Sequence, residues 1–348
     1  MAVMSMAERI TGGVDTHLDV HVAAALDGVG GLLGVEVFPA DAKGYRRLLG
    51  WLRGFGEVVV VGVEGTGSYG AGLMRHLHAS GVRVVEVDRP NRQVRRRRGK
   101  SDPVDAIAAA RAALSGDASV EPKTRTGDVE SLRVLRIVRL SARKDRTRAV
   151  NQMRSLVSTA PEVIREDMRD LPIAALLERA AGFRPAGRTD VLGATKTALR
   201  MLARRALALG EEIRALDIIL DPIVEELAPE LLTRPGVGCE VAGALLVAAG
   251  DNPQRLRSEA GFANLCGVSP LDASSGKQQR HRLNRGGDRQ ANSALWRVVM
   301  TRMTCDPATK AYIARRTAEG LSKREAMRCL KRFVARELYR YLPQPAPA

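Results

Sequence analysis

At 348 residues the chain is long enough for two or three domains, and its 55 Lys and Arg against 39 Asp and Glu give a net charge of +16. This basic excess indicates a polyanionic partner, while the aromatic content of 3% argues against a surface that binds single strands by stacking on every base. The four scattered cysteines, the lack of a signal-peptide pattern and the lack of about 18 uninterrupted apolar residues favour a cytoplasmic protein with reduced thiols and no membrane span.

Strand patterns dominate the first 88 residues. TGGVDTH and VHVAAAL are followed by GLLGVEVF after a glycine-rich turn, as in a β-meander, and EVVVVGVE (57–64) is typical of a strand buried on both faces. Helices are expected at about 42–52 and 70–79, and a further strand at 82–88. Three early strands followed by βαβ crossovers match a ribonuclease H-like fold, which we predict as an α/β domain over residues 9–125.

The rest of the chain is predicted to be helical. After a helix at 101–114, the segments 127–157 and 190–227 read as long amphipathic helices, separated by a loop at 182–188. The leucine spacing of the second segment predicts a helical hairpin or coiled coil, and we assign residues 126–228 to an all-α dimerisation arm.

A mainly α C-terminal domain is predicted over residues 229–343, with residues 344–348 as a disordered tail. It begins with a PGVG turn before an apolar helix, which resembles a helix-hairpin-helix loop and can equally be an ordinary helix start. Further helices are expected at about 290–302, 306–319 and 321–341.

Four acidic residues occupy positions suited to metal-assisted phosphodiester chemistry: Asp15, Glu64, Asp102 and Asp105. Asp15 and Glu64 close strand patterns, and Asp102 and Asp105 share one face at a helix start. Carboxylate oxygens suit Mg²⁺, and Mn²⁺ fits the same ligands. Taken singly, each has a simpler explanation, because acidic residues also complement a helix dipole or form turns.

A dinucleotide-binding fingerprint competes with this interpretation. Gly65, Gly67 and Gly70 follow a strand as G-x-G-x-x-G, and Glu86 and Asp88 lie about 20 residues further on. That hypothesis leaves the other acidic residues without a role and does not explain the adjacent basic run.

Basic residues suggest where nucleic acid would lie. A run directly precedes Asp102, and it comprises Arg92, Arg95, Arg96, Arg97, Arg98 and Lys100. An arginine stripe that includes Arg133 and Arg136 is a second candidate, and a Ser-Ser-Gly loop followed by Lys277, Arg285 and Arg289 is a third. Each can also be a solvated face, and serine in a glycine loop is commonly a turn former.

The motifs together resemble one family. VDTHLDVHVAAAL, VGVEGTGSYG and KSDPVDAIAAARAA resemble the RuvC-like DEDD domain of the insertion-sequence 110 family of transposases. PGVG, GFANLCGVSP, SSGK, NRGGDRQAN and the tail RRTAEGLSKREAMRCLKRFVARELY resemble the C-terminal transposase domain of the same family. Related DNA invertases share this layout.

The resemblance implies a specific mechanism. Asp15, Glu64, Asp102 and Asp105 match the family's metal-binding positions, and Ser275 matches its nucleophilic serine, with Ser274 as the adjacent alternative. The serine would form a covalent 5′-phosphoserine intermediate with double-stranded DNA at the element ends and target. A bridge RNA would guide the reaction, and a homo-oligomer, dimer or tetramer, would bring one protomer's acidic domain to another's serine.

Two other functions are compatible with the same residues. One is a metal-dependent, structure-selective nuclease in which the serine is idle, and the other is a catalytically inactive nucleic-acid-binding protein.

Overall fold

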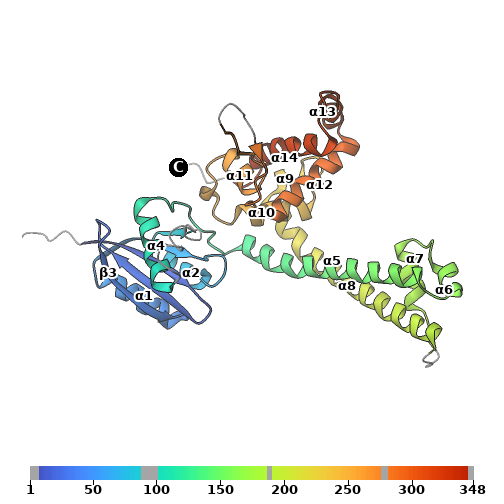
Figure 1. Cartoon of the computed structure of the whole chain (residues 1–348), viewed down its shortest axis with the longest axis horizontal. Helices are drawn as coiled ribbons and strands as arrows, with labels where there is room; N and C mark the ends of the chain where they lie inside the picture. The colour runs from blue at the N-terminus through green and yellow to red at the C-terminus, as the bar shows by residue number, and fades with distance from the viewer. Residues whose placement is uncertain (1–7, 88–100, 186–189, 276–280, 344–348) are drawn as a thin grey trace, which may run out of the picture. The chain divides into compact units, whose positions relative to one another are not determined.

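The computed structural model describes residues 8–87, 101–185, 190–275 and 281–343, which form two compact units (Figure 1). Unit 1 contains the chain up to Gly127 together with Ala249–Phe262, and unit 2 contains Asp128–Ala248 and Ala263–Pro343. A segment from the C-terminal half of the sequence therefore belongs to the N-terminal unit. The separation of an arm from a C-terminal domain at residue 228 stays a prediction.

Unit 1 is built on one mixed five-stranded sheet. Its strands are β1 (Arg9–Thr16), β2 (Val20–Leu26), β3 (Leu32–Pro39), β4 (Glu57–Glu64) and β5 (Val84–Val87), in the order β3-β2-β1-β4-β5. β2 pairs antiparallel with β1 on one side and with β3 on the other, whereas β4 runs parallel to both β1 and β5. The predicted mixed α/β domain is confirmed, and this order is compatible with a RuvC-like fold.

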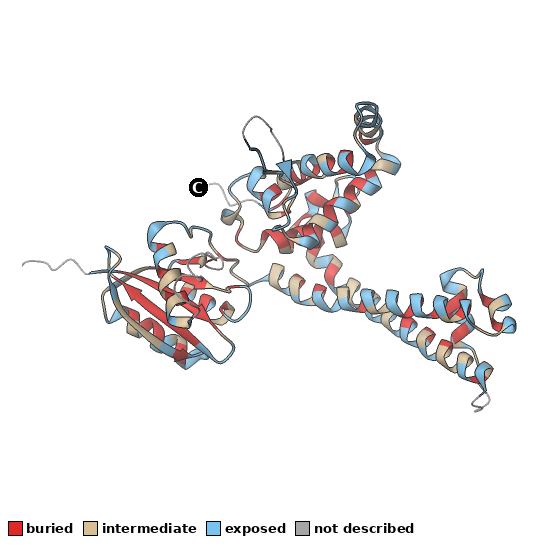
Figure 2. Cartoon of the chain, viewed as in Figure 1, coloured by how far each residue is buried: buried red, intermediate tan, exposed pale blue. Residues whose placement is uncertain are grey.

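Helices cover both faces of the sheet because its strands alternate. Ala23 and Ala25 pack with α1 (Ala42–Arg53) and α2 (Ala71–Ala79), while Val22 and Ala24 pack with α4 (Asp102–Ser115). Figure 2 shows the strands between them as buried. α4 lies very close to β1, because a Cβ built on Gly13 would stand 2.1 Å from the Ala110 nitrogen. A side chain at position 13 would push this helix off the sheet.

Polar contacts hold the segment Ala249–Phe262 to the rest of unit 1. Asn252, which is 3% exposed, donates from Nδ2 to the Pro122 carbonyl at 3.0 Å, and Arg255 donates from Nε to the Glu121 carbonyl at 2.9 Å. Asp251 accepts the backbone N–H of Thr126 at 2.7 Å. These bonds fix the stretch that follows α4 and leads out of unit 1.

Unit 2 contains a long helical hairpin. α5 (Asp128–Ser158) and α8 (Val191–Leu227) lie side by side, and α6 (Glu162–Met168) and α7 (Ile173–Ala181) pack at the far end (Figure 1). Their shared core includes Met153, Ile164, Leu177 and Leu199. The structure thus contains the hairpin that the leucine pattern predicted, together with two short helices that the sequence analysis did not identify.

The remainder of unit 2 is mainly helical, as predicted. It contains α9 (Pro229–Leu232), α10 (Cys239–Ala249), α11 (Glu259–Leu265, which begins in unit 1), α12 (Arg289–Cys305), α13 (Pro307–Ala318) and α14 (Lys323–Tyr339). A two-stranded hairpin, β6 (Leu271–Asp272) and β7 (His281–Arg282), precedes α12, and a short 3-10 helix, Pro253–Arg255, lies in the segment that returns to unit 1. None of the helices in the described ranges has the length and apolar character needed to cross a bilayer.

Candidate active site

Asp15 is directed toward α4 by the alternation of β1. Val14 packs in the core beneath α1 and α2, so Gly13 and Asp15 face the opposite side, where α4 lies. Asp15 is only 7% exposed. The strand thus holds a carboxylate in a largely buried position near its carboxyl end.

Glu64 ends the neighbouring strand on the same face. β1 and β4 are parallel with Val14 opposite Val63, so the next pair in this register is Asp15 and Glu64. Thr16 donates from Oγ1 to the Glu64 carbonyl oxygen at 2.8 Å, which ties the two strand ends together. Glu64 is half-buried.

Asp102 and Asp105 occupy the first turn of α4, as the sequence predicted. Ser101 precedes the helix with extended backbone angles, and Pro103 stands in its first turn, where a missing N–H costs no helical hydrogen bond. Asp105 is 3% exposed, whereas the Asp102 side chain is 47% exposed. The helix therefore presents one buried and one accessible carboxylate toward the sheet edge.

His17 completes a compact group of ligand atoms. Its Nε2 lies 3.2 Å from Asp15 Oδ2 and 3.4 Å from Asp102 Oδ1, and one ligand atom from each of these three residues lies within 4.8 Å of the others. His17 was not predicted as a site residue, although it stands two residues after Asp15 in VDTH. Among the described residues, the group contains neither the Glu64 nor the Asp105 carboxylate.

The electrostatics of Asp15 reflect this crowding. Burial raises the pKa of the Asp15 carboxyl above its ordinary value, and the charges of Asp105 and Asp102 raise it further, while His17 acts in the opposite direction. The fold thus holds three carboxyl groups close enough to repel one another. A bound cation would relieve this repulsion.

The donor set fits a divalent metal ion. Asp15 and Asp102 offer oxygen atoms with the imidazole of His17 beside them, Asp105 lies close enough to raise the pKa of Asp15, and Glu64 ends the adjacent strand. Oxygen-rich sites suit Mg²⁺ and Mn²⁺, and Mn²⁺ also accepts an imidazole nitrogen. The arrangement can therefore hold a hard cation at the carboxyl edge of the sheet.

Ser275 lies in unit 2. It follows β6 by three residues and is exposed, and the adjacent Ser274 is also exposed. Asp272 at the end of β6 accepts from His281 Nδ1 at 2.9 Å, which links the two sides of the hairpin. Both hydroxyls are therefore accessible to a large substrate.

The basic residues predicted to contact nucleic acid lie in different environments. Arg285 and Arg289 line one solvent-open cavity of about 320 Å³, and their contact with nucleic acid stays a prediction. Arg133 is half-buried and makes a two-bond ion pair with Glu130, three residues earlier on α5. Arg92, Arg95, Arg96, Arg97, Arg98, Lys100 and Lys277 lie outside the described residues.

Arg136 differs from its expected surface position. It is 5% exposed and donates from Nη1 and Nη2 to the Glu240 carboxylate at 3.1 and 3.3 Å. Arg139 and Arg297 also bind Glu240. The prediction of a nucleic-acid contact at Arg136 is therefore not supported, because its guanidinium is used inside the protein.

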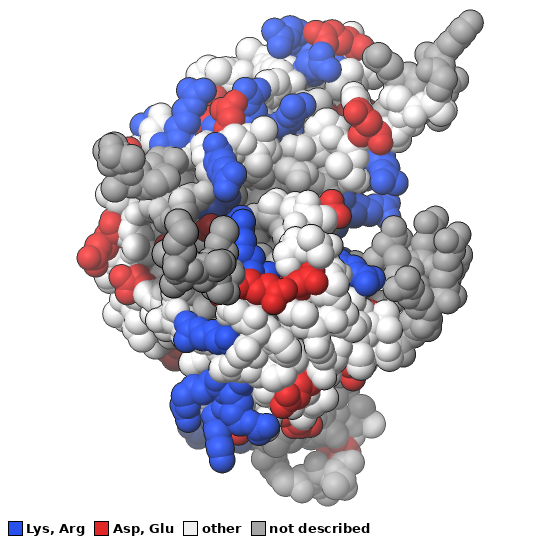
Figure 3. Space-filling model, turned by 90° about the vertical axis from the view of Figure 1, so that its left-hand side faces the viewer, with Lys and Arg blue, Asp and Glu red and all other residues white. Residues whose placement is uncertain are grey.

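Basic and acidic side chains are intermingled where the surface is visible. Figure 3 shows Lys and Arg spread over the pictured face with Asp and Glu among them. The net charge of +16 therefore does not by itself mark one binding face.

The competing dinucleotide fingerprint does not fit the sheet. Such folds use parallel strands, whereas β2 and β3 run antiparallel here. Glu86, proposed for the ribose in that hypothesis, accepts a hydrogen bond from Thr66 Oγ1 at 2.7 Å, and Asp88 lies outside the described residues.

Comparisons with known proteins place these features in a family context. Residues 12–160 match a family model for DEDD transposases of the IS110 type, described as "Transposase", and residues 228–314 match one described as "Transposase IS116/IS110/IS902 family". The chain is 34% identical over 134 residues to the "Insertion element IS110 uncharacterized 43.6 kDa protein" of Streptomyces coelicolor. This alignment covers 38% of the chain and 33% of that relative, about a third of its length.

Proposed function

Because this chain belongs to the IS110 family of transposases, we propose that it is a DNA transposase that cuts and rejoins DNA through a covalent 5′-phosphoserine intermediate. The acidic group of unit 1 and Ser275 of unit 2 are its reacting parts. Asp15, Glu64, Asp102 and Asp105 would hold Mg²⁺ or Mn²⁺.

The observation that best supports this proposal is the convergence of Asp15 and Asp102. They lie 87 positions apart in the sequence, on β1 and α4, yet both carboxylates reach the same His17 nitrogen at 3.2 and 3.4 Å. A helix dipole or a turn does not require such a convergence, and the close approach of α4 at Gly13 makes it possible.

In the proposed reaction, the Ser275 hydroxyl oxygen attacks a backbone phosphorus. The bond from phosphorus to the 3′ oxygen breaks as the bond to Oγ forms, and the proton lost by serine is balanced by the proton that the released 3′ hydroxyl takes up. A bound divalent cation supplies charge stabilisation for the phosphoryl oxygens. The acidic side chains position that charge, and His17, whose Nε2 lies 3.2 Å from Asp15 and 3.4 Å from Asp102, orients both carboxylates.

The proposed partners are double-stranded DNA at the element ends and target, a bridge RNA and further copies of this chain. The arm offers surface for self-association, because apolar side chains on both α5 and α8 are exposed: Ile137 at 56%, Ile218 at 75% and Ile219 at 51%. In the oligomer, one protomer would supply the acidic group and another would supply Ser275.

The test is whether the protein forms a covalent adduct with DNA. The chain is incubated with divalent metal, DNA containing the element's ends and RNA transcribed from its non-coding end, and adducts are detected on a denaturing gel. We expect an adduct with the natural sequence and with Ser274→Ala, and none with Ser275→Ala.

Other outcomes identify the competing functions. Metal-dependent cleavage without any adduct would indicate a nuclease in which the serine is idle. An adduct that persists in Ser275→Ala and disappears in Ser274→Ala would move the nucleophile by one position.

A further inference from the structure

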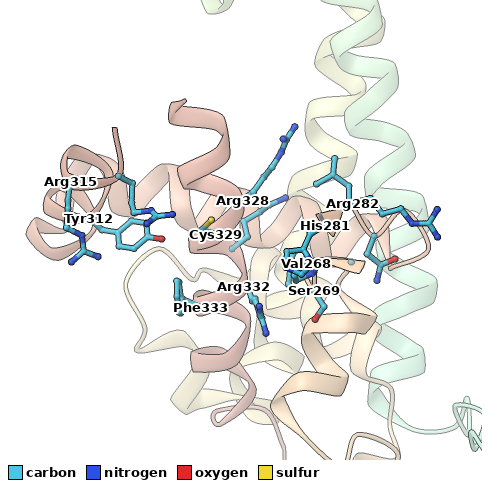
Figure 4. A pocket seen from close by; sticks show the side chains of 16 residues that line it. Val268, Ser269, His281, Arg282, Tyr312, Arg315, Arg328, Cys329, Arg332 and Phe333 are labelled. Atoms are coloured by element: carbon cyan, nitrogen blue, oxygen red, sulfur yellow. The ribbon is translucent and has the colours of Figure 1, made fainter. Parts of the chain in front are cut away.

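A cavity of about 550 Å³ opens in unit 2 beside the β6–β7 hairpin (Figure 4). Ser269 and His281 lie on one side, the α14 residues Arg328, Arg332 and Phe333 project toward it, and α13 contributes a further wall. The volume lies within the range of about 300–1,000 Å³ that is typical of pockets for small organic molecules. Neither the acidic group nor Ser275 contributes to the lining.

The charge of the lining favours an anion. No Asp or Glu is among the described residues that line the cavity. Six basic side chains line it: Arg282, Arg315, Arg316, Arg328, Lys331 and Arg332. Arg315 and Arg316 share one carboxylate, that of Glu319, and the buried Nε of Arg316 has no hydrogen-bond partner. Cationic groups thus outnumber the carboxylates that balance them.

An aromatic pair lies within this basic lining. Tyr312 and Phe333 meet edge to face, with ring centroids 6.1 Å apart, and the Arg315 guanidinium lies 5.4 Å from the Tyr312 centroid. Phe333 is 54% exposed. An exposed aromatic ring is notable in a chain with only 3% aromatic residues, because it offers a flat face for stacking next to cations.

The cavity adjoins a second one beyond the end of β7. A second cavity, lined by Arg285 and Arg289, shares Arg328 and Lys331 with the first. Lys331 is held in place by Asn292, to which its Nζ donates at 2.8 Å. A strand that follows these cations would pass beside Leu283 and Asn284, which line both cavities.

We propose that this cavity binds one unpaired nucleotide of a nucleic-acid strand, with its base stacked on Phe333 and its flanking phosphates held by Arg328, Lys331 and Arg332. Base stacking accepts any base, and guanidinium groups bind phosphate. In a regular duplex each base is stacked on its neighbours, so its face cannot reach the Phe333 ring. The inference rests on the proposed function, because it assigns the pocket to a strand that the recombination reaction leaves unpaired.

Binding by the full-length protein tests this assignment. Short single-stranded DNA and RNA probes with one central 2-aminopurine, and a duplex of the same DNA sequence, are titrated without divalent metal. Anisotropy reports affinity and 2-aminopurine quenching reports stacking. We expect quenching with a single strand and not with the duplex, and the tighter of the DNA and RNA complexes identifies the source of the nucleotide.

Two variants with matched controls separate stacking from charge. Phe333→Ala should weaken single-strand binding by roughly tenfold and remove the quenching, as the loss of one stacked base predicts, whereas Phe333→Trp should retain both. Trp296→Ala, which removes another exposed ring outside the cavity, should change neither. Arg332→Glu should weaken binding more than Arg324→Glu, which makes the same charge change on α14 outside the cavity.

The results distinguish failure of this inference from failure of the proposed function. Single-strand affinity and quenching that are unchanged in Phe333→Ala, or equal losses in Arg332→Glu and Arg324→Glu, would overturn the assignment of the pocket. Failure of the natural protein to bind the single strands and the duplex alike would contradict the proposed function as well. Phe333 and Arg332 are exposed, so their replacement should leave the fold intact, which circular dichroism checks.

Discussion

Asp15 is a buried carboxyl group surrounded by like charges. Its raised pKa, caused first by burial and then by Asp105 and Asp102, means that ionisation of this group destabilises the folded state at neutral pH. Such residues persist where the charge is needed, and a bound cation would turn the repulsion into attraction. The stability of unit 1 should therefore depend on both pH and metal.

Replacing Asp15 by Asn removes this charge and keeps the shape of the side chain. Without metal, Asp15→Asn should unfold at a higher temperature than the natural protein at pH 7. The difference should vanish as the pH falls below the ordinary Asp pKa of about 3.9, where Asp15 is protonated in both folded and unfolded states. Mg²⁺ or Mn²⁺ should stabilise the natural protein and have at least about tenfold lower affinity for the variant, as measured by thermal unfolding in a metal titration.

Asp117→Asn is the control for this experiment, because Asp117 is an exposed carboxylate beyond the opposite end of α4. It should leave the response to metal unchanged. A variant Asp15→Asn that binds metal as well as the natural protein would exclude Asp15 from the ligand set.

Single residues show what the sequence could and could not predict about the site. The strand and helix patterns predicted Asp15 and Glu64 near strand ends and Asp102 and Asp105 at a helix start, as found, whereas a metal site formed by all four stays a prediction. His17 was overlooked because a lone histidine has no spacing signature. Arg136 was misplaced because an arginine stripe looks the same whether it faces solvent or a buried carboxylate, and Glu240 lies 104 positions away.

Packing between α4 and the sheet determines whether the acidic residues can meet. Gly13→Ala would place a methyl group 2.1 Å from the Ala110 nitrogen and 2.3 Å from the Ala106 carbonyl oxygen, so the helix would have to move. We expect a loss of at least about 2 kcal/mol in the free energy of unfolding, together with weaker metal binding. Urea unfolding and a metal titration measure the two effects.

Gly50→Ala is the matched control in α1 of the same unit. A Cβ at Gly50 would meet nothing within 4 Å, so this change should stabilise the helix by about 0.5–1 kcal/mol. Equal effects of the two substitutions would show that α4 does not approach β1 as closely as described.

Glu240 joins the base of the arm to the C-terminal helices. Burial raises the pKa of its carboxyl, but Arg136, Arg139 and Arg297 outweigh this effect and hold the pKa below its usual value. The three guanidinium groups come from α5 and α12, and Arg139 also pairs with Asp217 on α8. One carboxylate thus links cations from two helices.

Removal of this carboxylate should be costly. Glu240→Gln should lower the free energy of unfolding of unit 2 by about 3–5 kcal/mol at pH 7, because it leaves the buried Arg136 without its counter-charge. The contribution of Glu240 is present above the unfolded Glu pKa of about 4.3 and is lost as the pH falls through the lower folded value, so the difference should shrink in acid. Urea unfolding at several pH values measures the stability difference between Glu240→Gln and the natural protein. The control is Glu226→Gln at an exposed position on α8, which should change stability by less than about 0.5 kcal/mol.

Elements with a strong local pattern were predicted well. The strands of unit 1 alternate or are continuously β-branched, and the arm helices carry a long apolar repeat, so local residues determine both. By contrast, α6 and α7 are short, and the return of Ala249–Phe262 to unit 1 depends on side-chain contacts such as that of Asn252 with the Pro122 carbonyl. Such long-range pairings leave no periodic signal in a single sequence.

In the whole molecule, the proposed reacting groups belong to different units. Asp15, Asp102 and their acidic neighbours are in unit 1, and Ser275 is in unit 2. The exposed apolar residues of the arm provide surface through which two copies could associate. We propose that each active site combines two protomers, one of which supplies the acidic group and the other the serine.

Mixing two inactive variants tests most directly whether two protomers share each active site. Asp102→Asn protein and Ser275→Ala protein are each expected to form no covalent adduct with DNA. When they are mixed and allowed to exchange protomers, a site with an intact acidic group from one and an intact serine from the other should form, and adduct should reappear on the Asp102→Asn chain alone. Adduct formation by either variant by itself, or no recovery in verified mixed oligomers, would contradict the account.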